Sequence, residues 1–194
     1  MPRRPRSKEI KEAEIGTYHV ITRTVRRAFL MGADAVSGKS YDDRREWLME
    51  RLQMLAPLFM IDIVSLSLLA NHIHLILRNR PDLVEKMSDE EVVRAWWAIS
   101  PQYRKNGQPG RLTPKRLRKL LRNAKHIRKC RERLSSISWF MRYLKQPLAV
   151  KANDQDDRSG HFFEARFRVV KMESLEQLVH AMVYVDLNAV RAGI

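Results

Sequence analysis

FMIDIVSLSLLANHIHLILR, residues 59–78, is the stretch that decides how the rest of the chain is arranged. It contains two short runs rich in Ile, Val and Leu, at 59–69 and 72–78, joined by Ala70-Asn71. Short apolar runs of branched residues are typical of buried strands, and a junction of two residues is typical of a hairpin. We therefore predict two buried antiparallel strands at the centre of the fold.

Working outward from this hairpin, strands and helices alternate along the chain. The order β-α-β-β-α-β predicts an α+β fold with a ferredoxin-like or RRM-like antiparallel sheet, followed by an additional C-terminal helix. We expect Pro147 to kink or end the second of the three helices. The flanking elements are a strand at 18–24, a helix at 41–55, a helix at 135–152, a polar loop at 153–160, a strand at 162–172 and a last helix from 174 to about 191.

A basic insertion interrupts this order. Residues 101–134 contain thirteen Lys and Arg against one acid, Glu132. Ser88-Asp-Glu-Glu predicts a helix that begins with a capping box, and the run from Thr113 to Lys125 predicts a basic amphipathic helix. We expect one domain over 1–194, with a basic helical insertion at 80–134 and a basic N-terminal arm at 1–15.

Composition narrows the classes of function. The 194 residues include 37 Lys and Arg against 22 Asp and Glu, a net charge of +15, which favours a polyanionic partner such as nucleic acid or an anionic membrane surface. Cys130 is the only cysteine, which excludes a disulfide framework and a zinc site built from several cysteines. No apolar segment follows Met1 as in a signal peptide, and the apolar run at 54–70 is short for a membrane span. We expect a cytoplasmic, nucleoid-associated protein.

His72 and His74 are two residues apart on the second strand of the hairpin. Side chains alternate between the faces of a strand, so both imidazoles project from one face, while Ile73, Leu75 and Leu77 project from the other. Two neutral imidazoles at this spacing can bind one divalent cation such as Mg²⁺ or Mn²⁺. The alternative is a pair of half-buried structural histidines whose hydrogen bonds are satisfied.

Tyr184 and Asn188 are four residues apart and therefore share one face of the predicted last helix. An amphipathic helix with a partly buried tyrosine is the simpler interpretation. The side-chain carbonyl of Asn188 is also suited to complete a metal site begun by two histidines. The opposite side of the helix carries the apolar residues Leu175, Leu178, Val179, Met182, Val183 and Val190.

Three motifs, in order, resemble those of a known family. Asn71-His-Ile-His-Leu-Ile resembles the HUH motif (histidine, hydrophobic residue, histidine) of single-stranded DNA nucleases. Ser159-Gly-His-Phe-Phe-Glu-Ala-Arg-Phe resembles the Gly-His-x-x-x-x-Arg-Phe box of IS200-like and REP-associated tyrosine transposases, and Tyr184-Val-Asp-Leu-Asn-Ala-Val-Arg-Ala-Gly resembles their final helix. Ala70 and Ala189 depart from the prolines common in this family. From about 18 to 194, apart from much of 80–134, the chain is similar to these transposases.

The resemblance implies a metal-dependent enzyme that nicks and rejoins single-stranded DNA. His72, His74 and Asn188 would bind Mg²⁺ or Mn²⁺, and Tyr184 would attack a phosphate to give a 5′-phosphotyrosine and a free 3′-OH. A covalent intermediate needs no ATP for rejoining, in agreement with a sequence that has no P-loop motif. The implied partner is single-stranded or hairpin DNA with inverted or palindromic repeats. Transposition and a domesticated role, and monomer and homodimer, both stay open.

Further residues are candidates for DNA contact. Basic side chains neutralise phosphates, and the resemblance places His161, Glu164 and Arg166 near the DNA. A solvated basic helix is the alternative interpretation. The basic candidates are Arg3, Arg4, Arg6, Arg111, Lys115, Arg116, Arg118, Lys119 and Arg122.

Two other functions compete with the transposase hypothesis. A non-catalytic RRM-like nucleic-acid-binding module explains the fold and the charge, but the strands lack the aromatic pattern on which RRMs stack bases. A replication or relaxase nuclease with an HUH motif usually carries a third metal-binding histidine or acid elsewhere and often a helicase region.

Overall fold

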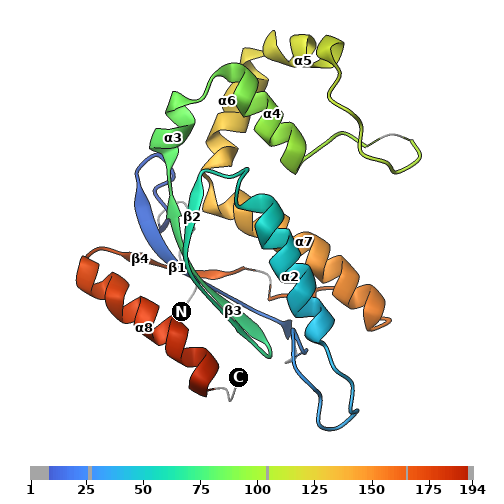
Figure 1. Cartoon of the computed structure of the whole chain (residues 1–194), viewed down its shortest axis with the longest axis vertical. Helices are drawn as coiled ribbons and strands as arrows, with labels where there is room; N and C mark the ends of the chain where they lie inside the picture. The colour runs from blue at the N-terminus through green and yellow to red at the C-terminus, as the bar shows by residue number, and fades with distance from the viewer. Residues whose placement is uncertain (1–8, 26–27, 104, 165, 192–194) are drawn as a thin grey trace.

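A four-stranded antiparallel sheet forms the centre of the computed structural model, which describes residues 9–25, 28–103, 105–164 and 166–191 (only the backbone for 189–191). The strand order is β2-β3-β1-β4 (Figure 1). This order confirms the predicted ferredoxin-like α+β fold. Arg3, Arg4 and Arg6 of the predicted N-terminal arm lie outside the described residues. The strands are β1 (Gly16–Arg23), β2 (Ile61–Leu69), β3 (His72–Asn79) and β4 (Arg168–Met172).

Helices cover both faces of this sheet. Helices α2 and α7 pack together on one face, α8 crosses the other face over β2, and α3 to α6 are stacked beyond one end of the sheet (Figure 1). Among the residues described, none of the helices has the length and apolar character needed to cross a membrane. The helices are α2 (Asp42–Leu55), α3 (Pro81–Lys86), α4 (Asp89–Ile99), α5 (Pro114–Leu121), α6 (Ala124–Leu134), α7 (Ile137–Gln155) and α8 (Leu175–Arg191).

Strand β3 is the central member of the sheet and pairs along its whole length with β1 and β2. As predicted, Ile73, Leu75 and Leu77 enter the main core, where each is at most 1% exposed. Full burial of one such side chain stabilises the fold by roughly 1.5–3 kcal/mol. Ala70-Asn71 forms the predicted two-residue turn between β2 and β3.

Two predicted helix starts are confirmed by their hydrogen bonds. The Ser88 hydroxyl accepts from the Glu91 backbone N–H, and the Glu91 carboxylate accepts from the Ser88 N–H at 2.7 Å, which completes a capping box. The Thr113 hydroxyl caps α5 by accepting from the Arg116 backbone N–H, and Pro114 occupies the first turn, where no hydrogen-bonding N–H is needed.

The basic helix predicted to run from Thr113 to Lys125 is wrong, because the structure divides it. Helix α5 ends at Leu121. Asn123 then begins α6, and its side chain accepts from the backbone N–H of His126 at 3.0 Å. An asparagine that caps a new helix competes with continuation of the old one. The basic residues therefore lie on two short helices with different directions.

Helix α7 continues through Pro147 to Gln155, which corrects the alternative that Pro147 ends the helix and also the predicted loop at 153–155. A proline inside a helix costs about 3 kcal/mol. Leu144, Leu148 and Ala152 lie on the buried side of α7 around the proline and are at most 3% exposed. The burial of two leucines, at roughly 1.5–3 kcal/mol each, offsets that cost.

The predicted strand at 162–172 is shorter in the structure, where only Arg168–Met172 is a strand. Phe162, Phe163 and Phe167 are all buried, so this segment does not alternate between two faces. It follows the end of β1 irregularly, and the backbone N–H of Glu164 donates to the carbonyl of Arg23 at 2.8 Å. The three phenylalanines that suggested a strand instead fill the core beside α7.

Only part of the predicted apolar side of α8 faces the sheet, since Leu178 and Met182 are half-buried whereas others are exposed. Leu175, Val179 and Val183 are 75%, 48% and 51% exposed, whereas Val185 is completely buried. The helix thus lies on the sheet with the side that includes Val185 and Asn188, and Asn188 is half-buried. An apolar stripe predicts the buried side of a helix only when contacts with the rest of the protein do not select another side.

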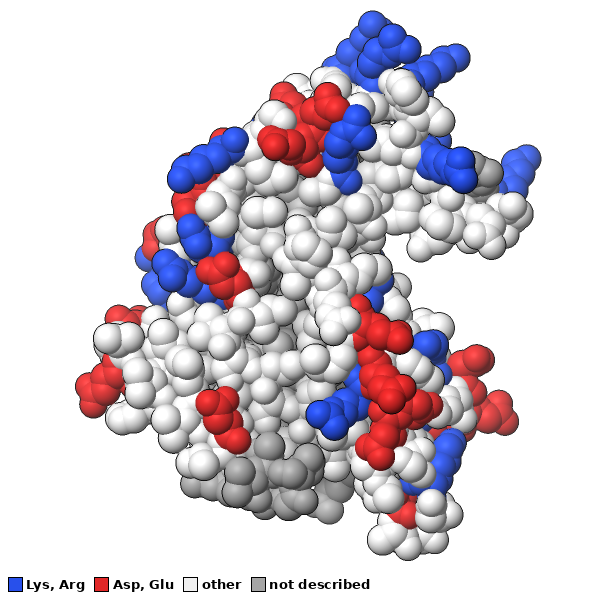
Figure 2. All heavy atoms as spheres, in the orientation of Figure 1, with Lys and Arg blue, Asp and Glu red and all other residues white. Residues whose placement is uncertain are grey.

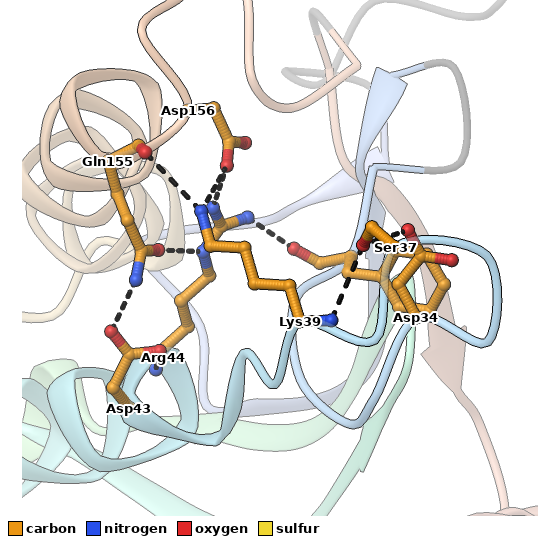
Figure 3. A network of polar contacts seen from close by, with 8 residues as sticks. Asp34, Ser37, Lys39, Asp43, Arg44, Gln155 and Asp156 are labelled. Carbon is orange, nitrogen blue, oxygen red and sulfur yellow. Dashed lines mark hydrogen bonds and ion pairs between the residues drawn. The ribbon is translucent and has the colours of Figure 1, made fainter.

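Arg44 is fully buried on α2 and ties this helix to the end of α7 (Figure 3). Its guanidinium donates to the Phe29 carbonyl at 2.5 Å and to Gln155 Oε1 at 2.6 Å, and it pairs with the Asp156 carboxylate. Gln155 in turn donates to the carboxylate of Asp43. Because a guanidinium keeps its charge when buried, these partners must offset its desolvation.

Arg44→Ala is expected to lower the free energy of unfolding by about 3–5 kcal/mol, because it leaves Asp156 without its buried partner. The matched control is Arg94→Ala, which removes an exposed pair with Glu90 and should change stability by less than about 0.5 kcal/mol. Urea denaturation of both variants measures the difference. Equal losses would contradict a dominant role for the Arg44 network.

Candidate functional site

His72 and His74 project from β3 toward α8, as the alternation of the strand predicts. His74 is 3% exposed and lies opposite Ile21 of β1 and Ser67 of β2. The two imidazole centroids are 5.0 Å apart. Two imidazoles this close can bind a single ion only if both present an unprotonated nitrogen.

Helix α8 places Tyr184 directly beside this pair. The phenol ring centroid is 5.7 Å from that of His74, and the tyrosine is 46% exposed. The carboxylate of Asp186, two residues further along, accepts from the Ser65 hydroxyl of β2 at 3.0 Å and links the helix to the sheet. The phenol is therefore close to the histidines and also open to a substrate from solvent.

Several polar atoms at this site are buried and have no hydrogen-bond partner within the described residues. They include His74 Nε2, Ser67 Oγ and Asn188 Nδ2. Buried polar atoms are nearly always paired, so an unpaired group is typical of a place that binds water, an ion or a ligand or that has a catalytic role. Asn188 lies one helical turn after Tyr184, so the structure puts all four predicted site residues on the same face of the sheet or on the helix that covers it.

The hydrogen bond of His72 determines which of its nitrogens is free. Its Nδ1 lies 2.7 Å from Oδ1 of Asn71, the residue before it. A carbonyl oxygen only accepts, so Nδ1 carries the proton and Nε2 carries the lone pair. An imidazole held in this way is the usual form of a metal-binding histidine.

The sequence analysis missed His19, which lies in β1 on the same face of the sheet. Its Nε2 is 2.9 Å from Nδ1 of His74, and its ring centroid is 6.2 Å from that of Tyr184. His19 is 8% exposed. A histidine at an alternating position of the first strand was the available signal, but only the pairing of β1 with β3 brings it to His74.

Burial keeps all three imidazoles neutral. It lowers the pKa of His74 to about 4, with smaller contributions from the nearby His19, His72 and Arg23. Burial also lowers the pKa of His19, and burial together with the charge of Arg23 lowers that of His72. Desolvation disfavours the imidazolium form, so these side chains carry lone pairs at neutral pH.

The residues present fit a divalent cation with two imidazoles and one amide oxygen as protein ligands. In the described part of the chain, no group of three or more His, Cys, Asp or Glu residues is arranged to hold a metal ion. The fit therefore depends on Asn188 as a third donor and on the unpartnered, buried Nε2 of His74. Imidazole suits several transition metals, and amide oxygen suits Mg²⁺ and Mn²⁺.

A second candidate region is a basic groove of about 1110 Å³ formed by α5 and the segment before it. No acid is among the described residues that line it, and Tyr103 on its wall is 69% exposed. Figure 2 shows the blue side chains gathered on α5, which lies at the opposite end of the molecule from the β2–β3 turn (Figure 1). All six predicted basic candidates of the insertion line the groove: Arg111, Lys115, Arg116, Arg118, Lys119 and Arg122.

The residues of the Gly-His box lie apart from the groove. His161 is exposed and, with Glu164, lines a cavity of about 550 Å³ between α7 and the segment 160–167. Arg166 is exposed on the same segment. The segment is joined to the end of β1 near the histidines through the hydrogen bond from Glu164 to Arg23. The predicted DNA contacts thus fall into two separate regions.

The burial of His74 predicts that the metal-free protein loses stability on acidification. The pKa of His74 falls from 6.5 to about 4 on folding. Between these two values the unfolded chain binds a proton that the folded chain does not, so the free energy of unfolding should decrease as the pH drops through this window. Urea denaturation at about pH 7 and about pH 5 should show a smaller decrease in His74→Gln than in the wild type. An identical pH dependence in both proteins would contradict the prediction.

The fold is similar to that of a known transposase. No protein-family model and no curated protein matches the chain. A solved structure of a REP-associated tyrosine transposase bound to a REP hairpin covers 100% of this chain and 74% of its own, with 13% sequence identity and a TM-score of 0.52. A crystal structure of a protein from Deinococcus radiodurans R1 that is assigned as a transposase covers 89% of this chain and 90% of its own, with 13% identity and a TM-score of 0.40. At the level of the fold, the first comparison confirms the resemblance to the REP-associated tyrosine transposases.

Proposed function

We propose that this protein is a transposase-type enzyme that nicks and rejoins single-stranded or hairpin DNA with Tyr184 as the nucleophile. The observation that carries the proposal is the contact of an exposed phenol on α8 with the buried His74 of the histidine pair on β3, at 5.7 Å between the rings of Tyr184 and His74. Similarity of the fold to a REP-associated tyrosine transposase supports the same function. The active site then lies between β3 and α8.

His72, His74 and Asn188 would hold Mg²⁺ or Mn²⁺ in this enzyme. The unpartnered buried nitrogen of His74 and the orientation of His72 by Asn71 support this ligand set. A divalent cation bound there would polarise the scissile phosphate and offset the charge that develops on its oxygens.

Tyr184 carries out the chemical step. Its hydroxyl oxygen attacks the phosphorus of a backbone phosphodiester and gives up its proton. The bond from phosphorus to the 3′ oxygen breaks, and that oxygen leaves as a 3′-OH with a proton. The 5′ end stays on the enzyme as a phosphotyrosine. Attack by another 3′-OH reverses the step, so strands are rejoined without ATP.

The basic groove on α5 would bind the phosphates of the same DNA at a distance from the cut. Its six basic side chains and the lack of acids on its described walls support this role. The guanidinium of Arg116 lies 5.0 Å from the ring of Trp97, which orients one of these charges. The solved REP-associated tyrosine transposase of similar fold is bound to a hairpin, so a DNA with a duplex stem and a single-stranded foot is the substrate form we propose.

A non-catalytic RRM-like module is the competing function. RRMs stack bases on the open face of their sheet. Here α8 covers that face, and its buried residues are histidines and aliphatic side chains rather than a row of exposed aromatic rings. This arrangement favours the enzyme, and covalent chemistry distinguishes the two hypotheses.

Tyr184→Phe is expected to abolish the covalent protein–DNA adduct while hairpin binding changes by less than about threefold. The phenol oxygen is the proposed nucleophile, and its loss leaves the ring in place. The protein is incubated with a 3′-labelled hairpin oligonucleotide and Mn²⁺, because the fragment that stays on a 5′-phosphotyrosine carries the 3′ label, and adducts are separated after denaturation. Tyr41→Phe is the matched control, because it removes a half-buried tyrosine hydroxyl outside both the candidate site and the basic groove and should leave the adduct intact. An adduct that survives in Tyr184→Phe would overturn the assignment of the nucleophile.

Arg116→Gln combined with Arg118→Gln is expected to weaken hairpin binding and to reduce its dependence on salt. Each lost phosphate contact lowers the slope of log affinity against log salt by about 0.7–0.9. Fluorescence anisotropy at several salt concentrations measures the slope. Arg128→Gln, which removes an exposed charge on α6 outside the groove, should change neither quantity appreciably. Equal effects of the groove and the control variants would indicate a general charge effect.

A further inference from the structure

We propose that His19 is a positioning residue that accepts the Nδ1–H of His74 and so keeps the lone pair of His74 on Nε2, where it can bind the cation. The inference rests on the proposed function, since it concerns the nitrogen that the metal would use. His19 itself does not touch the DNA or the ion in this role. It acts only through the ring of His74.

The hydrogen bond between the two histidines permits only two arrangements of the proton. Nε2 of His19 and Nδ1 of His74 are 2.9 Å apart, and one of them must donate. If His19 donates, His74 carries its own proton on Nε2, which is buried and has no acceptor among the described residues. If His74 donates, its Nε2 is a bare lone pair. A buried N–H without an acceptor is rarer in proteins than a buried acceptor without a donor, which favours the second arrangement. A metal ion also binds only to a nitrogen that has a lone pair.

The second histidine of the pair shows the same pattern. Nδ1 of His72 donates to Oδ1 of Asn71, which leaves Nε2 of His72 as the nitrogen with the lone pair. With His19 as the acceptor for His74, both imidazoles would donate from Nδ1 and present Nε2. An imidazole protonated on Nε2 has no lone pair there, so His72 and His74 can both bind one ion through Nε2 only if His74 carries its proton on Nδ1.

No other described side chain takes over this role from His19. Across β3, His74 is flanked in register by Ile21 and Ser67. Ile21 offers no acceptor, and the hydroxyl of Ser67 is buried without a hydrogen-bond partner, including His74. His19 is 8% exposed and lies on β1, so its position is fixed by the pairing of β1 with β3 and β4. Removal of His19 therefore leaves Nδ1 of His74 without an acceptor.

The first test reads the protonated nitrogen of His74 directly in the metal-free full chain. Long-range ¹H–¹⁵N correlation spectra are expected to show His74 protonated on Nδ1 in the wild type. His19→Leu should move the proton toward Nε2, and His19→Gln should restore the wild-type pattern because an amide oxygen near the position of Nε2 can accept. A wild-type His74 protonated on Nε2, or a proton that does not move in His19→Leu, would overturn the proposal. If His19→Leu does not fold, the wild-type spectrum still tests the proposal, because His74 protonated on Nδ1 supports it and His74 protonated on Nε2 overturns it.

The second test measures Mn²⁺ affinity by electron paramagnetic resonance with the free metal ion. Loss of the partner of a ligating histidine weakens metal binding by about 10–100-fold, so we expect this loss in His19→Leu and a loss of less than about threefold in His19→Gln. His126→Leu, on α6, is the matched control for removal of a partly buried histidine and should bind Mn²⁺ like the wild type. Wild-type affinity in His19→Leu would overturn the proposal.

The outcomes separate this inference from the proposed function. A wild-type protein that forms the adduct and binds Mn²⁺, with a His74 proton that is independent of His19, overturns only the role of His19. A wild-type protein that binds no Mn²⁺ overturns the metal site and the role of His19 together. Adduct formation, Mn²⁺ binding and a proton that moves only in His19→Leu support both.

Discussion

The pairing of β3 with a strand on each side is the constraint on which the rest of the structure depends. Successive side chains of β3 point to opposite faces, so one register buries Ile73, Leu75 and Leu77 in the main core and turns His72 and His74 toward α8. A slip by one residue would exchange the two sets and bury imidazoles in place of aliphatic groups. Core packing and the geometry of the candidate site are thus determined by the same register.

The two faces of the sheet have different tasks. The face under α2 and α7 is filled with apolar side chains and carries the stability. The face under α8 combines aliphatic residues such as Ile76 and Val185 with three histidines and with polar atoms that have no partner within the described chain. Burial there lowers the pKa of His74 and keeps it neutral. Buried polar atoms without partners destabilise the metal-free protein, and their presence agrees with the proposed binding of a cation and a phosphate on this face.

In the proposed function, the helices between β3 and α7 place the DNA-binding surface apart from the catalytic site. Arg131 of α6 holds this part together by donating to the backbone carbonyls of Val84 and Met87 and to the carboxylate of Asp89. The basic groove lined by α5 lies far from the β2–β3 turn (Figures 1 and 2). A basic surface outside the active site can bind DNA without adding positive charge beside neutral histidines, which would lower their metal affinity further.

Periodicity and local hydrogen-bonding groups were enough to predict the element order, the β2–β3 turn and the caps at Ser88 and Thr113, because these depend on neighbours in the chain. They also predicted that His72 and His74 share a face and that Tyr184 and Asn188 share a helix side. Local patterns failed where distant contacts compete with them: at Pro147, whose cost is offset by core burial, and on α8, where the sheet selects a different face.

By itself, the sequence determined the fold class, the histidine pair and the basic insertion. Only the tertiary structure decided that the ring of Tyr184 lies 5.7 Å from that of His74, that His19 is within hydrogen-bond distance of His74, and that Arg44 is completely buried. The physical reason is that alternation and helical spacing assign each side chain to a face of its own element. Which faces meet depends on strand pairing and packing between residues far apart in the chain, which no local pattern records.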